Sequence, residues 1–201
     1  MAKMTQSMNL DDHYRSKLKQ IVFSQHALMQ RLIFLRQIKA QAYLSAGVIR
    51  NLVWSELHQQ QYKIEHTEID VIFYDLTNQY SEQQGLTRLL NQQFPENEWD
   101  VVNQAFVHTW YKTDRGLSIS QYSSLIDALS VWVETATAVA VRLLENDDLE
   151  IIAPFELNDL FELKLRWNNR LVSREVFIQR VQSKQFLEKW NKLRIVEIEE
   201  E

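Results

Sequence analysis

Two carboxylates that are spaced for shared metal binding lie in the stretch Glu68-Ile69-Asp70-Val71-Ile72-Phe73-Tyr74-Asp75. β-branched and aromatic residues dominate this stretch, and a turn begins at Thr77, so the pattern predicts a β-strand. Successive side chains of a strand point to opposite faces, which puts Glu68 and Asp70 on the same face. Carboxylates that converge in this way can hold Mg²⁺ or Mn²⁺, because both ions prefer oxygen ligands.

Gly47, Arg50 and Asn51 are candidates for binding a nucleotide. They lie near the start of a helix predicted over residues 45–58, where Gly47 would let phosphates approach backbone N–H groups. Arg50 could donate two hydrogen bonds to one phosphate. Metal ions and such donors are the main requirements of phosphoryl and nucleotidyl transfer. Taken singly, each feature has a structural explanation as a surface charge or a helix-start glycine, so the inference depends on their combination.

Hydrophobic periodicity predicts an α+β or α/β fold, with a small mixed β-sheet flanked by helices and long helices at the N-terminus. Helices are expected over residues 11–39 (one long helix or two packed ones), 45–58, 77–94, 120–132 and 173–190, with a short one near 158. Strands are expected over residues 68–75, 99–105, 135–143 and 149–153, the last two as a hairpin that turns at Asn146-Asp147-Asp148. Without internal repeats or low-complexity linkers, residues 1–201 are expected to form a single domain, with 1–9 and 197–201 mobile.

Composition excludes several classes of function. The absence of cysteine excludes disulfides, thiol catalysis and zinc–thiolate sites. The histidines have no paired ligand spacing, and P-loop and serine-hydrolase motifs are absent from the sequence. No apolar run suits a signal peptide or a membrane span, so the expected location is the cytoplasm and no membrane partner is expected.

Several blocks of the chain resemble a bacterial nucleotidyltransferase-like family that was long catalogued as a domain of unknown function. The blocks are Ala46-Gly47-Val48-Ile49-Arg50-Asn51-Leu52-Val53-Trp54, Glu68–Asp75, Val102-Asn103-Gln104-Ala105 with His108, Trp132–Val139, Ile152-Ala153-Pro154-Phe155 and Asp159-Leu160-Phe161. The resemblance covers about residues 30–195. It implies a fold of the DNA polymerase β type, with the acid-x-acid pair as the metal site.

The chain departs from this family in two positions. Glu68 stands where the family usually has aspartate, and Glu156 stands where it tends to have glycine. The family itself lacks the Gly-Ser pair that is typical of well-characterised nucleotidyltransferases. The resemblance therefore speaks more strongly for the fold than for the activity.

Two residues compete for the role of a third catalytic carboxylate. Glu134 is the first choice because it belongs to a block that resembles the family, just before the strand predicted over residues 135–143. Asp100 is the alternative because its apolar neighbours in the strand predicted over residues 99–105 give an apolar-acid-apolar pattern. Asn103 and Gln104 could hydrogen-bond a base or ribose, or they could satisfy buried backbone groups.

The C-terminal region is basic and carries interleaved aromatic residues. Its cations are Lys164, Arg166, Arg170, Arg174, Arg180, Lys184, Lys189, Lys192 and Arg194. Such a region could bind RNA, or it could be a solvated helix face with its aromatic residues packed inward. Two functions are therefore expected: a metal-dependent nucleotidyltransferase that moves a nucleoside monophosphate from a triphosphate to an unknown acceptor, or a catalytically inactive nucleotide- or RNA-binding protein on the same fold.

Overall fold

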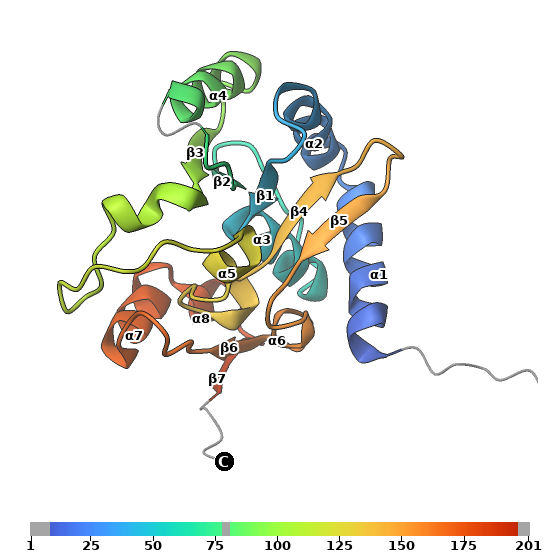
Figure 1. Ribbon diagram of the computed structural model, residues 1–201. Coiled ribbons are helices and arrows are strands. Elements are labelled where there is room, and N and C mark those ends of the chain that lie inside the picture. The colour runs from blue at the N-terminus through green and yellow to red at the C-terminus, as the bar shows by residue number, and fades with distance from the viewer. Residues whose placement is uncertain (1–8, 78–80, 197–201) are drawn as a thin grey trace, which may run out of the picture.

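The computed structural model describes residues 9–77 and 81–196 and has a mixed α+β fold around a five-stranded sheet (Figure 1). The strand order is β3-β2-β1-β4-β5; β2 and β3 are parallel, and the other neighbours are antiparallel. The predicted mixed sheet with flanking helices is therefore confirmed. The strands are β1 (Tyr43–Ser45), β2 (Glu68–Phe73), β3 (Glu98–Asn103), β4 (Ala140–Leu143) and β5 (Leu149–Ile152).

Helices surround this sheet, and the C-terminal helices lie at the end of the molecule opposite α4 (Figure 1). The longer helices are α1 (Leu10–Ser24), α2 (His26–Ile38), α3 (Gly47–Leu57), α4 (Ser81–Gln93) and α7 (Arg174–Ser183). The shorter elements are η1 (Gln104–Thr109), α5 (Leu125–Leu129), η2 (Thr135–Thr137), α6 (Asn158–Phe161) and α8 (Phe186–Lys189), with the parallel strand pair β6 (Lys164–Arg166) and β7 (Arg194–Val196). Residues 1–8 and 197–201, most of the ends expected to be mobile, lie outside the described residues.

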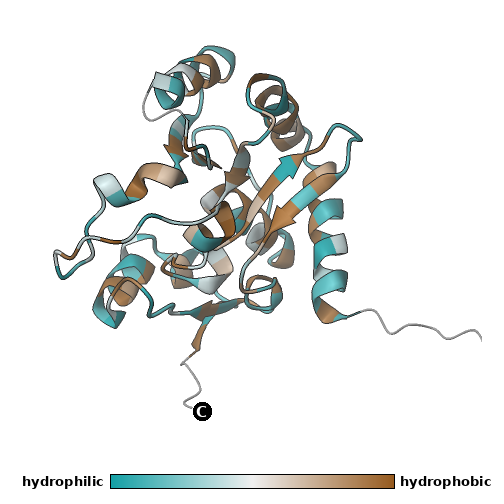
Figure 2. Ribbon diagram, viewed as in Figure 1, coloured by the Kyte–Doolittle hydropathy of each residue, from teal (hydrophilic) through white to brown (hydrophobic). Residues whose placement is uncertain are grey.

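The sheet has one fully covered face and one partly covered face. Leu44 and Val71 join the main hydrophobic core, which also contains residues of α1, α2 and α3. Tyr43 and Ile72 point the other way and pack with residues of α5 in a smaller cluster. Because Asp70 precedes Ile72 by two residues, its side chain lies on this second face. Hydrophobic residues gather around the sheet, whereas the visible side of α1 is largely hydrophilic (Figure 2).

Local sequence signals fix several helix boundaries. The side chains of Ser124 and Ser173 accept hydrogen bonds from backbone N–H groups at the starts of α5 and α7, as N-cap residues do. Asn103 caps η1 by accepting a hydrogen bond from the N–H of Ala105. Helix α4 ends two residues before Pro95, which cannot continue a helix. In the part of the chain that is described, no helix combines the length and the apolar character needed to cross a bilayer.

The structure corrects several predicted boundaries. Residues 135–143 were predicted as one strand, but η2 occupies 135–137 and β4 begins only at residue 140. The strand predicted over residues 99–105 ends at Asn103, and the helix predicted over 120–132 is limited to α5. The helix predicted over 173–190 is interrupted because Gln185 has a φ of +54°, a left-handed conformation that stops a helix.

Candidate active site

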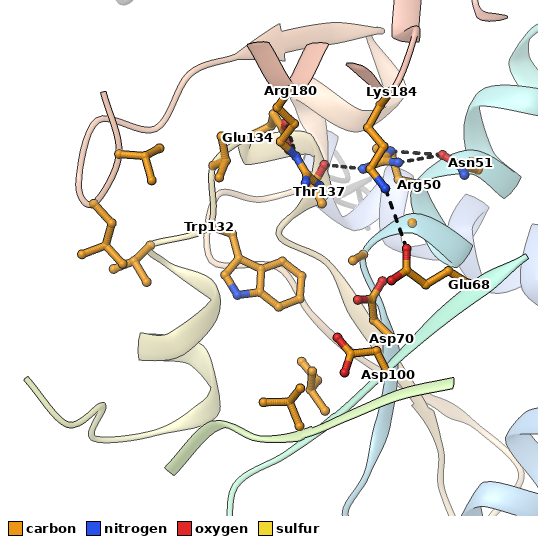
Figure 3. Close-up of a pocket in the computed structure, with 18 of the residues that line it drawn as sticks. Arg50, Asn51, Glu68, Asp70, Asp100, Trp132, Glu134, Thr137, Arg180 and Lys184 are labelled. Atoms are coloured by element: carbon orange, nitrogen blue, oxygen red, sulfur yellow. Dashed lines mark hydrogen bonds and ion pairs between the residues drawn. The ribbon is translucent and has the colours of Figure 1, made fainter. Parts of the chain in front are cut away.

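Three carboxylates from two adjacent strands line one pocket. Asp70 of β2 and Asp100 of β3 are direct partners in the parallel register, and Glu68 precedes Asp70 on the same face. Neighbouring strands lie about 4.8 Å apart, so this register brings the Asp100 side chain beside that of Asp70. The pocket has a volume of about 540 Å³ and lies on the sheet face opposite the main core. Figure 3 shows the three carboxylates in a row along one wall of the pocket.

Gly47 connects this row to the N-terminus of α3. Its backbone N–H lies near the carboxylate of Asp70 and favours the ionised form of that group, which lowers its pKa. A methyl group on Gly47 would lie 3.9 Å from Oδ2 of Asp70 and 3.8 Å from Nη2 of Arg50. Glycine therefore leaves open the space between the acidic strand and the helix N-terminus, where backbone N–H groups favour an anion.

The residue before Gly47 is held in a strained backbone conformation. Ala46 has φ +52° and ψ −118°, a region that L residues with a Cβ rarely adopt. Its N–H donates to the carbonyl of Val139 and its carbonyl accepts from the N–H of Arg50, so both neighbouring elements hold it in place. Strain of this kind is found at functional sites, where the surrounding structure enforces a required chain direction.

Burial and nearby negative charge both disfavour the ionised form of Asp70. Burial, followed by the nearby carboxylates of Glu68 and Asp100, raises the pKa of Asp70 to about 6, although the Gly47 N–H and Arg50 oppose the shift. Burial and the charge of Glu68 likewise raise the pKa of Asp100. A cation bound between these groups would relieve both effects.

The donor set fits Mg²⁺ or Mn²⁺ as an open site. All of its candidate ligands are carboxylate oxygens, which suit these ions. Among the described residues, no three acidic or histidine side chains are close enough together to enclose a metal ion. An open site agrees with the usual binding of Mg²⁺, which takes one or two protein carboxylates and completes its shell with substrate phosphates and water. Glu68 and Asp70, the predicted metal ligands, are thus brought together.

Arg50 lines the pocket but is tightly packed. Its side chain is buried, donates to Oγ1 of Thr137 at 2.9 Å and to Oδ1 of Asn51 at 2.9 Å, and lies over the ring of Phe186. Burial lowers the pKa of Arg50 to about 10, while the nearby charge of Glu134 opposes this shift. The guanidinium therefore forms a fixed positive wall next to Gly47, and Asn51 is positioned mainly as its partner.

Glu134 lies on the other wall of the pocket and is paired with a cation. It is fully buried, and its Oε1 accepts a hydrogen bond from Nε of Arg180 at 2.7 Å (Figure 3). Its Oε2 is also buried and has no hydrogen-bond partner among the described residues. It precedes η2 rather than a strand, so it lacks the register that aligns Asp100 with Asp70. Of the two candidates for a third carboxylate, the structure brings Asp100 to the acidic pair.

The C-terminal elements contribute a row of cations that faces the carboxylates. Arg180, Lys184 and Lys189 line the pocket, and Nζ of Lys184 lies 3.7 Å from Oε2 of Glu68. Part of the basic region that could bind RNA is therefore next to the acidic row. Its aromatic residues Phe177, Phe186 and Trp190 are buried, as expected of a helical segment packed against the core.

Asn103 and Gln104 have different surroundings. The amide of Asn103 accepts from the backbone N–H groups of Asp75 and Ala105 and donates to the carbonyl of Asp75, so it satisfies backbone groups where β2 and β3 end. Gln104 is almost fully buried and lines the pocket.

Sequence reasoning missed several lining residues. The indole of Trp132 lies across the pocket from Asp70 and Asp100 (Figure 3), and Thr137 holds Arg50. Both belong to a block that carries the family resemblance, but no local pattern gives them a role. In the sequence, Lys189 is one of several cations of the basic C-terminal region, and nothing distinguishes it as a lining residue.

Comparison with known proteins gives a consistent result. A family model described as nucleotidyltransferase matches residues 36–195. A solved structure titled as a CCA-adding enzyme head domain is 28% identical with a TM-score of 0.76, covering 91% of this chain and 96% of that one. Two structures of CCA-adding enzymes, an apo form and the Thermotoga maritima enzyme with tRNA, each give a TM-score of 0.55 at 15% identity.

These two comparisons cover 89% of this chain but only 44% and 42% of the larger enzymes, so the chain spans less than half of their length. At that identity the likeness concerns the fold alone. No match was found among curated proteins. With most of its length matched by the family model, and with the acidic strand and the glycine-started helix in place, the chain belongs to the nucleotidyltransferase family.

Proposed function

We propose that this protein is a metal-dependent nucleotidyltransferase that moves a nucleoside monophosphate from a nucleoside triphosphate to an acceptor. One observation carries the proposal: Glu68, Asp70 and Asp100 line the same pocket wall, with Asp70 beside Gly47 at the start of α3 and cations on the opposite wall. A single pocket therefore offers a cation site and a polyphosphate site in contact with each other.

The chain's own residues divide the work of binding and orientation. Glu68 and Asp70 hold Mg²⁺ or Mn²⁺, which when bound neutralises charge on the phosphates and orients them. The N–H groups at the start of α3 and the cations Arg180 and Lys184 bind the triphosphate, while buried Arg50 adds a fixed positive charge beside Gly47. Asn51 holds Arg50 in orientation, and Gln104 lines the region available to the nucleoside.

Asp100 is assigned to the reacting hydroxyl group of the acceptor. Its carboxylate lies next to Asp70 on the neighbouring strand and lines the same pocket, so it is placed to accept the proton of a hydroxyl group bound there. Glu134 has another task, because it neutralises Arg180 and contributes to the field around Arg50. In this assignment Glu134 positions the phosphate-binding cations.

Titration calorimetry with ATP, CTP, GTP and UTP, each with and without Mg²⁺, tests the proposal. For at least one nucleotide, wild-type protein is expected to bind much more tightly when Mg²⁺ is present. In the Glu68→Gln, Asp70→Asn double variant, Mg²⁺ is expected to have little effect, while metal-free nucleotide binds at least as well as to wild type, because two repelling charges are gone.

A Glu56→Gln variant is the control, since Glu56 is an exposed carboxylate of α3 outside the pocket. It should keep the wild-type response to Mg²⁺. Equal dependence on Mg²⁺ in the double variant and in wild type would contradict the proposal. Binding without transfer to any acceptor would favour the inactive nucleotide-binding protein instead.

A further inference from the structure

A second cavity adjoins the candidate active site at Asp100. It has a volume of about 760 Å³ and lies between α4 and β3. Asp100, Val102 and Trp110 line both this cavity and the first pocket, so the two spaces meet at these side chains. The described residues that line only the second cavity come mainly from α4. A ligand in this cavity would therefore reach the carboxylate of Asp100 from the side of β3.

The arrangement of charges gives the two spaces different roles. In Figure 3, Arg180 and Lys184 lie at one end of the acidic row and Asp100 lies at the other, with Asp70 between them. Transfer of a nucleotidyl group proceeds with the attacking oxygen and the leaving oxygen roughly in line on opposite sides of phosphorus. If the pyrophosphate leaves toward the cations, the attacking hydroxyl group must enter from the Asp100 end, where the second cavity opens.

The lining of the second cavity is mostly uncharged and polar. Gln84, Thr87 and Asn91 line it from α4 with amide and hydroxyl groups. Trp110 is 61% exposed and offers a flat apolar surface at the junction of the two spaces. An aromatic platform with a few hydrogen-bonding groups suits a ligand that has both an apolar face and hydroxyl groups.

Charge argues against a nucleic-acid acceptor at this place. Among the described residues that line the second cavity, Arg88 is the one cation and Asp100 the one anion. Proteins bind the backbone of RNA or DNA through several lysine and arginine contacts, which make affinity strongly dependent on salt. The cations of this chain that lie near the site belong instead to the first pocket.

We propose that the cavity between α4 and β3 is the acceptor site and that the acceptor is a small, neutral, polyhydroxylated molecule such as a sugar or cyclic polyol. This rests on the proposed nucleotidyl transfer. An acceptor hydroxyl oxygen forms a bond to the α-phosphorus, and the bond from that phosphorus to the oxygen bridging to the β-phosphate breaks. Pyrophosphate leaves with the electron pair, and the hydroxyl proton passes to Asp100 or to water.

The test uses the full chain with two neutral probes, methyl β-D-glucopyranoside and myo-inositol, and one competing probe, a twelve-residue oligoadenylate with a free 3′-hydroxyl group. Binding is followed by NMR at the indole N–H of Trp110, first without nucleotide. A Gln84→Ala, Asn91→Ala double variant removes two exposed amides that line only the second cavity. A Gln92→Ala, Gln93→Ala double variant removes two exposed amides of the same helix that do not line it.

At least one neutral probe is expected to shift the Trp110 signal. Its dissociation constant should rise about tenfold or more in the Gln84→Ala, Asn91→Ala variant, the loss expected when hydrogen bonds worth about 1.4 kcal/mol are removed. In the Gln92→Ala, Gln93→Ala variant the dissociation constant should not change. Both variants should bind Mg²⁺–nucleotide like wild type, and label from an α-phosphorus-labelled triphosphate should pass to the bound probe.

The acceptor proposal is overturned if neither neutral probe shifts the signal, if both variants lose binding equally, or if oligoadenylate alone binds there and accepts label. The binding results are independent of nucleotide binding, because the probe titrations contain no nucleotide; only the transfer of label requires it. If the protein binds nucleotide normally but binds neither neutral probe, only the acceptor assignment is wrong. If the protein binds a neutral probe but no Mg²⁺–nucleotide, the proposed nucleotidyl transfer is wrong and the ligand site remains.

Discussion

At the scale of single residues, the acidic strand could be predicted from the sequence, which left the third carboxylate open between Glu134 and Asp100. Glu68 and Asp70 share a face because of the two-residue repeat of any strand, which is a local property. The apolar neighbours of Asp100 mark it as a candidate, but its position beside Asp70 depends on the register between β2 and β3, which joins residues 30 positions apart. The family-like sequence around Glu134 makes it the first choice for the third carboxylate, but only the fold shows that it is buried and paired with Arg180.

Substitution of the two candidates should separate their roles. We expect Asp100→Asn to lower kcat by on the order of 100-fold or more with little change in stability, because the side chain lines the pocket and takes no part in the hydrophobic core. Glu134→Gln should cost about 1–3 kcal/mol of unfolding free energy, because it weakens a buried charged hydrogen bond, and should reduce kcat much less. Thermal unfolding and initial rates measure both effects, and the opposite ranking of kcat would contradict the assignment.

Asp75 should make stability depend on pH. Hydrogen bonds from the Thr77 hydroxyl and N–H, and then from Lys39, lower the pKa of Asp75 to about 2. Because the folded-state pKa lies below the unfolded value, this contribution is fully present above about pH 4 and is lost as the pH falls toward 2. Asp75→Asn should therefore destabilise the protein at pH 7 and have a shrinking effect between pH 4 and 2. Urea unfolding across this range is the measurement, and a pH-independent difference would refute the prediction.

At the scale of elements, long periodic segments could be predicted and short ones could not. The helices over residues 10–38 and the hairpin of β4 and β5 were predicted from periodicity and turn residues, and the structure confirms both. Strand β1 has only three residues, all buried, so it shows no alternation that could reveal it. The break between α7 and α8 was missed because a glutamine, Gln185, takes a left-handed conformation that usually signals glycine.

Glu156, like Gln185, has a positive φ although it is not glycine. The resemblance marked this residue as a replacement for glycine, and the structure gives it a φ of +58° while its N–H still donates to the carbonyl of Ala153. The turn thus persists although a residue with a Cβ occupies it, which carries a conformational cost.

Ala46 offers a direct test of strain at the junction of β1 and α3. Ala46→Gly should raise the free energy of unfolding by about 1 kcal/mol, because relief of the left-handed strain exceeds the extra backbone entropy of glycine. Chemical denaturation compares the variant with wild type. Ala42→Gly, at a buried alanine without positive φ, is the control and should destabilise the protein. A loss of stability in both variants would mean that the junction is not strained.

At the scale of the whole molecule, the pocket exists because the C-terminal helices fold back onto α3. Trp54 of α3 packs edge-on against Phe186 and Trp190, and the guanidinium of Arg50 lies over the Phe186 ring. This cluster holds the elements that carry Lys184 and Lys189 opposite the acidic strand. The acidic strand and the basic C-terminal segment could both be recognised in the sequence. That they face each other could not, because this depends on contacts between residues more than 100 positions apart.

Loss of the Phe186 ring should weaken both the fold and the pocket. Phe186→Ala is expected to cost about 3–5 kcal/mol, because the ring is fully buried, and to weaken nucleotide binding through displacement of Arg50 and the nearby lysines. Leu187→Ala is the matched control, since Leu187 is 39% exposed on the same helix and should have a small effect. Denaturant unfolding and nucleotide titration give the two readouts, and similar effects of the two substitutions would refute this view of the C-terminal segment.

The most direct test of the central claim is the position of a metal ion in crystals grown with MnCl₂ and an α,β-methylene nucleoside triphosphate that cannot be cleaved between these phosphates. We expect an anomalous-scattering peak in contact with carboxylate oxygens of Asp70 and at least one of Glu68 and Asp100, with the triphosphate between that peak and the cations of α7 and α8. A nucleotide bound elsewhere, or a manganese ion held by the phosphates without any contact to Asp70, would contradict it.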